Sequence, residues 1–408
     1  MEKILNLRRL DDIRRNLRFA NSDRTKSTED QVHVEMTVYK KFEDLHSRLL
    51  LKSNAPELHK ELHKFFLLDC LSRLPSAYES LDASRPWLCY WILHPLSLMG
   101  VRVDDVTKSM IAQFLRKCQS PDGGFGGGPG QYAHLAPTYA AVCALVIVGT
   151  HEAYRIIDRQ KLYAFLMSVK QSDGSFAMHN GGEVDIRGVY CALSVASLTG
   201  ILTTELVRDT AEWIISCQTY EGGFSGCPGL EAHGGYAFCG LAALVILNKG
   251  HLCDNQALMR WIVQKQMRVE GGFQGRTNKL VDSCYSFWQG GGFPLLYTLL
   301  AKDDLAPHDH LFDERALQEY ILICCQHAQG GMVDKPGKPR DVYHTCYTIS
   351  GLSVAQHFLE EKHVLGTYKN ELAKTHPLYN IRPDLVRKSL LYFHSLEKFQ
   401  SFSSYGST

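Results

Sequence analysis

A short glycine-containing signature occurs five times along this chain at nearly constant spacing, and this repeat restricts the fold more than any other feature. Each copy starts with Gln, passes through one or two Gly residues and ends in Phe or Met; the copies are 119–125, 171–176, 218–224, 266–273 and 326–332. Their final residues lie 51, 48, 49 and 59 positions apart. A fixed period of this size indicates an architecture of stacked supersecondary units.

Each signature stands between two apolar stretches with helical spacing. The stretch before it also carries charged residues, as in 111–118, whereas the stretch after it is apolar nearly all round, as in 140–148. A helix without a polar face belongs in the interior. A tyrosine marks each inner stretch, and one more upstream marks a sixth unit; the six are Tyr90, Tyr139, Tyr190, Tyr236, Tyr285 and Tyr347. We therefore expect an all-α fold, an α/α six-unit barrel of helix–Gly-rich turn–helix repeats, with an open helical solenoid as the alternative.

The composition is that of a globular chain and excludes several function classes. Of 408 residues, 45% are hydrophobic and 21% charged, which argues against a disordered chain. The 44 basic and 43 acidic residues leave a net charge of +1, so no basic field favours a nucleic-acid partner. No apolar run reaches the roughly 18 residues of a transmembrane segment. Thirteen cysteines without a signal peptide indicate reduced thiols and a cytoplasmic location.

The distribution of charge divides the chain into three parts. Residues 1–60 are rich in charged side chains, and we expect a charged N-terminal arm that is partly disordered or bound to a partner. Residues 61–395 contain the repeat and form the barrel domain, and residues 396–408 are a C-terminal tail.

Alignment of the six units on their tyrosines brings one column of residues to the start of the inner helices. Three positions before each tyrosine stand Trp87, Ala136, Arg187, His233, Asp282 and His344. In a closed barrel these positions lie around one rim, because equivalent residues begin equivalent helices. A purely structural repeat would keep apolar residues there, so the polar members indicate a site in the last four units.

Asp282, Cys284 and His344 are candidate metal ligands. The carboxylate and the thiol stand two residues apart at a helix start, and the imidazole occupies the same column in the next unit. Oxygen, sulfur and nitrogen ligands with a fourth position open are the pattern of catalytic zinc. Taken singly, the three residues also fit a helix N-cap, a small core residue and a core histidine. The zinc hypothesis therefore depends on their convergence.

A basic cluster and an aromatic wall accompany this column. Arg276 and Lys279 come shortly before Asp282, and Arg187 and His233 join them through the column. Cations near helix N-termini suit a diphosphate, although Arg276 and Lys279 alone would also fit a solvated loop. Aromatic side chains inside a barrel suit a long apolar ligand such as an isoprenoid; they are Trp87, Tyr90, Trp91, Tyr139, Tyr190, Tyr236 and Trp288.

Four long motifs closely resemble the beta subunits of the protein prenyltransferases, and among these the subunits that transfer farnesyl. The motifs are 119–131, 231–236 (Glu-Ala-His-Gly-Gly-Tyr), 271–289 and 334–347, within a resemblance from about Ser76 to Phe358. The resemblance implies an α/α barrel that works with an alpha subunit, which supplies a further catalytic lysine. Its substrates would be farnesyl diphosphate and proteins with a C-terminal CaaX box, whose cysteine is alkylated.

The resemblance also implies roles for individual residues. One zinc ion would be held by Asp282, Cys284 and His344, and magnesium by Asp334. Farnesyl diphosphate would contact a set from two loops and the adjoining helices, namely His233, Gly234, Gly235, Tyr236, Arg276, Thr277, Asn278, Lys279 and Tyr285, with Tyr285 acting on the diphosphate. The isoprenoid would lie against Arg187, Tyr190, Cys239 and Trp288, and the chain-length and peptide pocket would contain Trp87, Trp91, Tyr343 and Tyr347.

The resemblance favours farnesyl over the longer geranylgeranyl donor. Trp87 and Tyr347 fall where farnesyl enzymes have bulky residues. Asp334 points the same way, because geranylgeranyl enzymes, which otherwise resemble this chain, have a lysine at that position and need no magnesium. Residues Gly290, Gly291 and Gly292 depart from the family pattern of Ala and Leu. Because glycine weakens a helix interior, we expect a kink or a locally wider cavity there.

Three other readings remain open at this stage. A geranylgeranyltransferase beta subunit differs only in its donor. A terpene cyclase also uses Gln- and Gly-rich repeats on an α/α barrel, but the acidic Asp-x-Asp-Asp run that would supply its proton is absent. A non-enzymatic helical scaffold would leave the convergence of Asp282, Cys284 and His344 unexplained.

Overall fold

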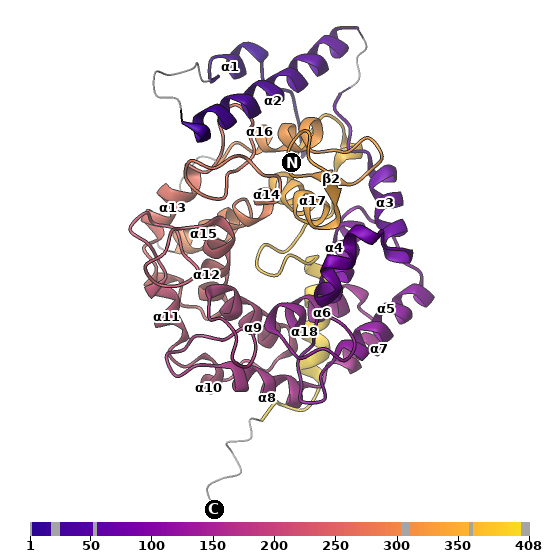
Figure 1. Ribbon diagram of the computed structural model, residues 1–408, viewed down its shortest axis with the longest axis vertical. Coiled ribbons are helices and arrows are strands. Elements are labelled where there is room, and N and C mark those ends of the chain that lie inside the picture. Colours follow the sequence, from indigo (N-terminus) through magenta and orange to yellow (C-terminus); the bar gives the residue numbers. More distant parts are fainter. Residues whose placement is uncertain (1, 18–24, 52–54, 303–310, 359–361, 401–408) are drawn as a thin grey trace, which may run out of the picture.

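Six inner helices surround a common axis in the computed structural model, which describes residues 2–17, 25–51, 55–302, 311–358 and 362–400 (Figure 1). They are α4 (Arg85–Leu98), α6 (Leu135–Val148), α9 (Ile186–Thr199), α12 (Gly234–Ile246), the pair α14 (Tyr285–Trp288) and α15 (Gly292–Lys302), and α17 (Val342–Gln356). Each packs on the next, and α17 packs on α4. The ring is therefore closed, which confirms the predicted barrel and excludes the open solenoid.

An outer layer of helices alternates with the inner ring along the chain. Its members are α3 (Lys60–Ser72), α5 (Asp105–Cys118), α8 (Arg159–Val169), α11 (Thr210–Ser216), α13 (Asn255–Val263) and α16 (Glu314–Glu319), which continues into η3 (Tyr320–Cys324). Short helical segments connect the layers: η1 (Ser76–Ser84), α7 (His151–Ile156), α10 (Thr204–Val207), η2 (Gly250–Leu252) and η4 (Tyr368–Asn370). The final helix, α18 (Pro383–Ser395), lies against α6 and α9. Within the described residues no helix combines the length and apolar character needed to cross a membrane.

The repeated signature is a small hairpin whose aromatic end is buried. Isolated β-bridges join Gln218 to Phe224 and Gln266 to Phe273, and equivalent bridges close the other three turns. The side chains of the final Phe or Met are fully buried in all five copies. The glutamines also join neighbouring units: Gln266 donates to the carbonyl of Asp313 and accepts from its N–H, both at 2.8 Å, just before α16.

A glycine in each turn lies directly against the backbone of the next outer helix. Gly174 has a φ of +91°, and a Cβ placed on it would lie 2.2 Å from the carbonyl oxygen of Asp209, the residue before α11. The same approach occurs between Gly123 and α8, Gly222 and α13, and Gly271 and α16. In the last turn Gly330 meets the carbonyl of Leu62 in α3, so the outer layer closes on itself as the inner ring does.

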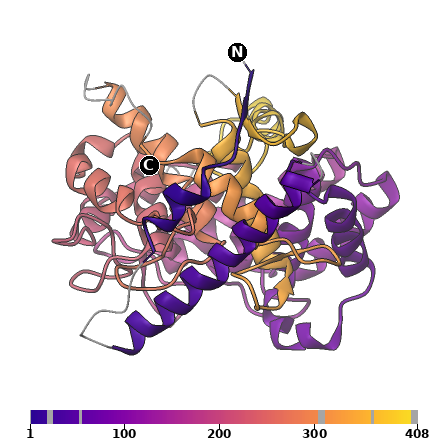
Figure 2. The same cartoon turned by 90° about the horizontal axis from the view of Figure 1, so that it is seen from above.

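The N-terminal arm packs on the outside of the barrel near the point of closure. Helix α2 (Lys26–Leu51) crosses the side of the barrel beside η3, and α1 (Leu10–Arg14) packs on α2 (Figure 2). The first strand, β1 (Glu2–Leu5), pairs in parallel with β4 (Lys362–Leu365), while β2 (Met332–Val333) pairs with β3 (Arg340–Asp341). The division of the chain at residues 60 and 395 stays a prediction, and the tail's residues 401–408 lie outside the described residues.

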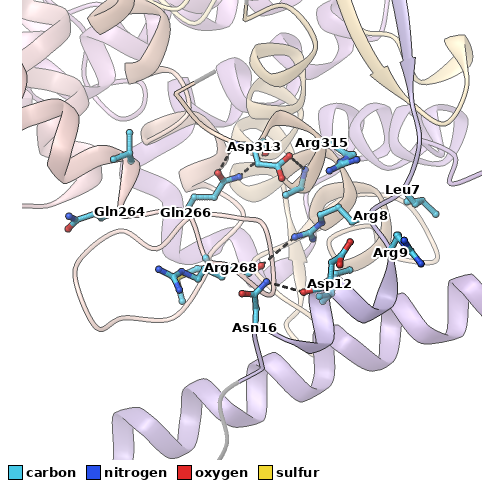
Figure 3. A pocket seen from close by; sticks show the side chains of 14 residues that line it. Leu7, Arg8, Arg9, Asp12, Asn16, Gln264, Gln266, Arg268, Asp313 and Arg315 are labelled. Atoms are coloured by element: carbon cyan, nitrogen blue, oxygen red, sulfur yellow. Dashed lines mark hydrogen bonds between the residues drawn. The ribbon is translucent and has the colours of Figure 1, made fainter. Parts of the chain in front are cut away.

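One buried ion pair connects the arm to the barrel. The guanidinium Nε and the backbone N–H of Arg8 both donate to the carboxylate of Glu319, each at 2.5 Å. Beside this pair the arm and the barrel enclose a polar cavity of about 800 Å³, lined by Arg9, Asp12 and Asn16 on one side and by residues of the 264–268 turn on the other (Figure 3).

The inner helix of the fifth unit is interrupted at the three glycines. Helix α14 ends at Trp288 and α15 begins at Gly292. A Cβ on Gly290 would lie 2.1 Å from the carbonyl oxygen of Ser286, and one on Gly292 would lie 2.8 Å from Ile262. The expected kink is therefore present, and its cause is the close packing of backbone that only glycine permits.

Two glycines between α8 and α9 allow the cost of backbone strain to be measured separately from the cost of a steric clash. Gly181→Ala, whose Cβ would meet nothing within 4 Å at a φ of +72°, should lower the free energy of unfolding by about 1–2 kcal/mol. Gly174→Ala adds the clash with Asp209 and should lower it by about a further 1–3 kcal/mol. Urea denaturation of both variants measures the difference, and equal losses would contradict the role of the glycine contact in joining the units.

Candidate active site at one rim of the barrel

A cavity of about 380 Å³ lies inside the ring at the ends where the inner helices begin. Twelve of the residues predicted to bind substrate line it: Trp87, Trp91, Arg187, Tyr190, His233, Gly235, Tyr236, Cys239, Tyr285, Trp288, Tyr343 and Tyr347. A volume in the range of small-ligand pockets, with mostly aromatic walls and a few polar groups, fits an apolar chain with a polar head.

Aromatic contacts fix the shape of the wall. The rings of Trp87 and Trp91 stack with centroids 5.2 Å apart, and Trp87 also contacts Tyr139 at 5.6 Å. Trp91 continues the wall to Tyr343 at 5.4 Å. There Trp288 lies 4.4 Å from Tyr347, and its indole N–H donates to the hydroxyl of Tyr343 at 3.2 Å. Such ring pairs are specific in geometry, so the wall is preorganised.

The structure brings the three predicted metal ligands together beside the cavity, next to the lining residues Tyr285 and Tyr343. One ligand atom each from Asp282, Cys284 and His344 lies within 4.8 Å of the other two. Asp282 stands at the N-terminal end of α14, where one carboxylate oxygen accepts the N–H of Cys284 at 2.9 Å. The same oxygen lies 3.3 Å from Nε2 of His344, across the junction with α17.

A fourth residue, Asp341, orients the histidine. It is the N-cap of α17: one oxygen accepts the N–H of His344 at 2.7 Å, and the other accepts Nδ1–H at 2.6 Å. Burial alone would lower the pKa of His344, but its hydrogen bonds to Asp282 and Asp341 raise it to about 10. With Nδ1 held by a carboxylate, Nε2 faces the other two ligands, which is the usual arrangement behind a metal-binding histidine.

The donor set fits a zinc ion. Only 4% of Cys284 is exposed, and burial together with the nearby Asp282 raises the pKa of its thiol well above the usual range. A cation between these groups would reverse that preference, because a coordinating thiol loses its proton. One oxygen, one sulfur and one nitrogen ligand with room for a fourth match the ligand types of zinc.

Asp334 lies beside this cluster. Its backbone carbonyl accepts the N–H of Ser283 at 2.9 Å and the hydroxyl of Tyr320 at 3.0 Å. Its carboxylate pairs with Lys335 at 2.5 Å. Burial and the neighbouring Asp282 raise the pKa of Asp334, whereas Lys335 and His344 act to lower it.

His233 and Tyr285 form a second polar pair on the cavity wall. His233 caps α12 by accepting the N–H of Gly235 on Nδ1 at 3.1 Å, and its Nε2 lies 3.0 Å from the hydroxyl of Tyr285. Burial and the nearby Arg276 lower the pKa of His233, so the ring is neutral and carries its proton on Nε2. The histidine therefore donates to Tyr285, and the phenolic O–H stays available to an anion.

The predicted basic loop lies at the rim and outside the cavity lining. Arg276 pairs with Glu231 at 3.0 Å, and both side chains are 40% or more exposed. Thr277 accepts from Lys265 at 2.7 Å, while Asn278 takes a positive φ of 62° and Lys279 is exposed. Gly234 is also outside the lining, because it packs on the side chain of Gln289.

Sequence reasoning missed the carboxylates that hold the predicted side chains. Asp185 accepts two hydrogen bonds from the guanidinium of Arg187, at 2.9 and 2.6 Å. Asp341 likewise accepts from the ring of His344, and Glu231 from the guanidinium of Arg276. For Asp185 and Asp341 the available signal was their position two or three residues before the polar column, where an N-cap is expected. Glu231 carried no such signal, because His233 itself is the N-cap of α12. The lining residues Met178 and Cys191 were also missed, although Cys191 directly follows Tyr190.

Comparison with known proteins identifies the family. Residues 58–381 match the prenyltransferase alpha-alpha toroid domain. Protein farnesyltransferase subunit beta of Arabidopsis thaliana is 41% identical over 400 residues, covering 83% of this chain and 83% of its own. The chain belongs to the family of protein farnesyltransferase beta subunits. As a member of it, the chain is part of a protein prenyltransferase.

Two further relatives set the scale of this similarity. Geranylgeranyl transferase type-1 subunit beta of Arabidopsis thaliana is 31% identical, covering 74% of this chain and 87% of its own. Among solved structures, Candida albicans protein geranylgeranyltransferase-I complexed with GGPP has a TM-score of 0.68 at 22% identity, covering 82% of this chain and 99% of that chain. This structural likeness establishes the shared fold.

Gly275 is needed for the position of Tyr285. A Cβ on Gly275 would lie 2.1 Å from the Tyr285 ring, so Gly275→Ala should displace the phenol from His233 and lower kcat/KM at least about tenfold. Gly229→Ala at the same rim, where a Cβ meets nothing within 4 Å, is the control and should cost only stability. Steady-state kinetics measure both, and unchanged kinetics in Gly275→Ala would contradict this role of Tyr285.

Proposed function

We propose that this chain is the catalytic beta subunit of a zinc-dependent protein farnesyltransferase, which transfers farnesyl from farnesyl diphosphate to the cysteine of C-terminal CaaX proteins. The observation that carries the proposal is the position of the Asp282, Cys284 and His344 cluster beside an aromatic cavity, whose lining includes the adjoining Tyr285 and Tyr343. A metal site and an apolar pocket side by side are what the alkylation of a protein thiol by an isoprenoid needs.

The three ligands would hold one zinc ion, with Asp341 keeping His344 in the binding orientation. When bound, zinc supplies a Lewis acid that stabilises the substrate cysteine as a thiolate, which a free thiol of pKa about 8.5 mostly is not at neutral pH. The protein's own contribution is to place this thiolate beside the first carbon of the isoprenoid and to exclude water with the aromatic wall.

The leaving diphosphate would be received by the polar groups around Tyr285. The O–H of Tyr285, freed by the donation from His233, can donate to a diphosphate oxygen, and Arg276 and Lys279 can approach it from the rim. Asp334 is the proposed magnesium ligand, and its position close to the carboxylate of Asp282 supports this role. Stabilising the charge that develops on the leaving group lowers the barrier.

The aromatic wall favours farnesyl as the donor. Trp87 and Tyr347 line the cavity from the neighbouring helices α4 and α17, in contact with Trp91 and Trp288, and they occupy space that a longer chain would need. The higher identity to a farnesyltransferase than to a geranylgeranyltransferase beta subunit of the same organism supports this choice. A geranylgeranyl donor, which is longer by one isoprene unit, is the alternative.

We also propose that the working enzyme is a cytoplasmic heterodimer with an alpha subunit that supplies a further catalytic lysine. All thirteen cysteines are free thiols, which suits a reducing compartment. Co-expression with candidate alpha subunits, followed by competition between farnesyl and geranylgeranyl diphosphate on a CaaX peptide, tests the whole proposal. Transfer of geranylgeranyl alone would overturn the choice of donor.

Removal of the thiol ligand should remove metal and activity together. In Cys284→Ala the site keeps one oxygen and one nitrogen ligand, so zinc content and farnesyl transfer should both fall at least about a hundredfold. Cys253→Ala removes another buried thiol, far from the mouth, and should retain both. Metal analysis by mass spectrometry checks the prediction, and full activity in a zinc-free Cys284→Ala preparation would refute it.

Removal of the Trp87 ring should admit a longer donor. Trp87→Thr deletes a side chain that stacks on Trp91 and contacts Tyr139, so the kcat/KM ratio for geranylgeranyl over farnesyl diphosphate should rise at least about tenfold. The measurement is a two-donor competition assay. An unchanged preference would mean that Trp87 does not limit the length of the pocket.

A further inference from the structure

Three of the six repeat tyrosines have a role that the rim chemistry does not explain. Their hydroxyls point to the backbone of one segment, 376–381, that lies between η4 and α18 and enters the ring (Figure 1). Tyr90 donates to the carbonyl of Asn380 at 2.9 Å, Tyr190 to that of Leu378 at 2.8 Å and Tyr139 to that of Tyr379 at 3.4 Å. Three consecutive carbonyls of this segment are therefore held by three consecutive inner helices.

The segment is itself rigidly fixed. The side-chain oxygen of Asn380 lies 3.0 Å from Nε2 of His94 and accepts the hydroxyl of Thr375 at 3.0 Å. A turn closes through the N–H of His376 to the carbonyl of Ile381 at 2.8 Å. Asn380 is 1% exposed and adopts a left-handed φ of 49°. Two buried atoms of this network, Nδ2 of Asn380 and Nδ1 of His94, have no hydrogen-bond partner among the described residues. The network is therefore only partly paired, and the segment is held by the hydrogen bonds that it does make.

The same tyrosines support the wall of the prenyl cavity. Tyr139 and Tyr190 line the cavity with one face of their rings. Trp87, proposed above to limit donor length, contacts Tyr139 at 5.6 Å and Tyr90 at 6.1 Å. Tyr90 itself is fully buried and does not line the cavity. It lies behind the cavity wall, where its hydroxyl bonds the segment and its ring contacts Trp87.

We propose that the segment 376–381 is a specificity-determining element, which sets the usable depth of the prenyl pocket by fixing Tyr90, Tyr139 and Tyr190 and, through them, Trp87. The segment is a positioning element and does not touch the donor. The inference rests on the proposed function, since it concerns the choice of chain length in the same pocket.

We call the segment 376–381 together with Tyr90, Tyr139 and Tyr190 the floor of the pocket. A floor that is purely structural would behave differently from a floor that selects the donor. Loosening a structural floor lowers the stability of the enzyme and its activity with every donor alike. Loosening a selective floor lets the wall recede, so it improves the longer donor relative to the shorter one. The ratio of kcat/KM for geranylgeranyl and farnesyl diphosphate separates the two cases.

The decisive variant is Tyr90→Phe, tested in the heterodimer. It removes one hydroxyl and its bond to Asn380 while keeping the ring beside Trp87. We expect the geranylgeranyl-to-farnesyl ratio to rise at least about fivefold, mainly through a lower KM for geranylgeranyl diphosphate, with kcat for farnesyl within about twofold of wild type. The control is Tyr154→Phe, whose buried hydroxyl has no partner among the described residues, and which should leave the ratio unchanged.

A second variant loosens the segment directly. Asn380→Gly tolerates the left-handed φ, keeps the carbonyl and removes the contacts to His94 and Thr375. It should shift the ratio in the same direction as Tyr90→Phe. An unchanged ratio in both variants, with or without a lower melting temperature, would overturn the proposal. A wild-type enzyme that already prefers geranylgeranyl would refute the proposed donor, whereas the shift in either variant would still report on the floor.

Discussion

The contact between a turn glycine and the backbone of the following outer helix is the constraint on which the barrel depends. Gly174 lies so close to Asp209 that no side chain fits between them, and the equivalent contact recurs in every turn up to Gly330 and α3. In three of the five copies the glutamine of the signature adds two hydrogen bonds to the same stretch of backbone, as Gln266 does at Asp313. Five such contacts hold successive units at a fixed distance and angle, and the packing of α17 on α4 closes the ring.

Ring closure in turn creates the site, because it brings the N-terminal ends of the inner helices to one rim. The side chains that cap these ends also hold the chemical groups: Asp282 accepts the N–H of Cys284, Asp341 that of His344 and Asp185 that of Arg187. Capping satisfies backbone groups that would otherwise be unpaired. A residue required for helix stability is thus placed two or three positions from a ligand or a cation, and the site inherits the rigidity of the scaffold.

The sequence allowed those features to be predicted that follow from the repeat. It did not reveal the contacts between segments that lie far apart in the chain. The period revealed the barrel, its inner and outer helices and the column containing Asp282 and His344, because equivalent positions of equivalent units must meet. The segment 376–381 has no counterpart in the repeat, and its partner Tyr90 lies 290 residues away from Asn380. The ion pair of Arg276 with Glu231 joins two neighbouring units, and its two residues are 45 positions apart in the chain. Such contacts depend on loop conformations that periodicity does not encode.

The charge balance of the rim follows from the same construction. Two of the cations predicted from the sequence meet carboxylates of this chain: Arg187 meets Asp185 and Arg276 meets Glu231. Lys335, which was not predicted, meets Asp334 in the same way. An anionic ligand therefore competes with internal partners. It competes most easily at Arg276, because both members of that pair are at least 40% exposed and an exposed pair contributes only about 0–1 kcal/mol. Arg187 is held by two short contacts to a mostly buried carboxylate, so it stays a fixed part of the wall while the outer cation is the one free to follow a diphosphate.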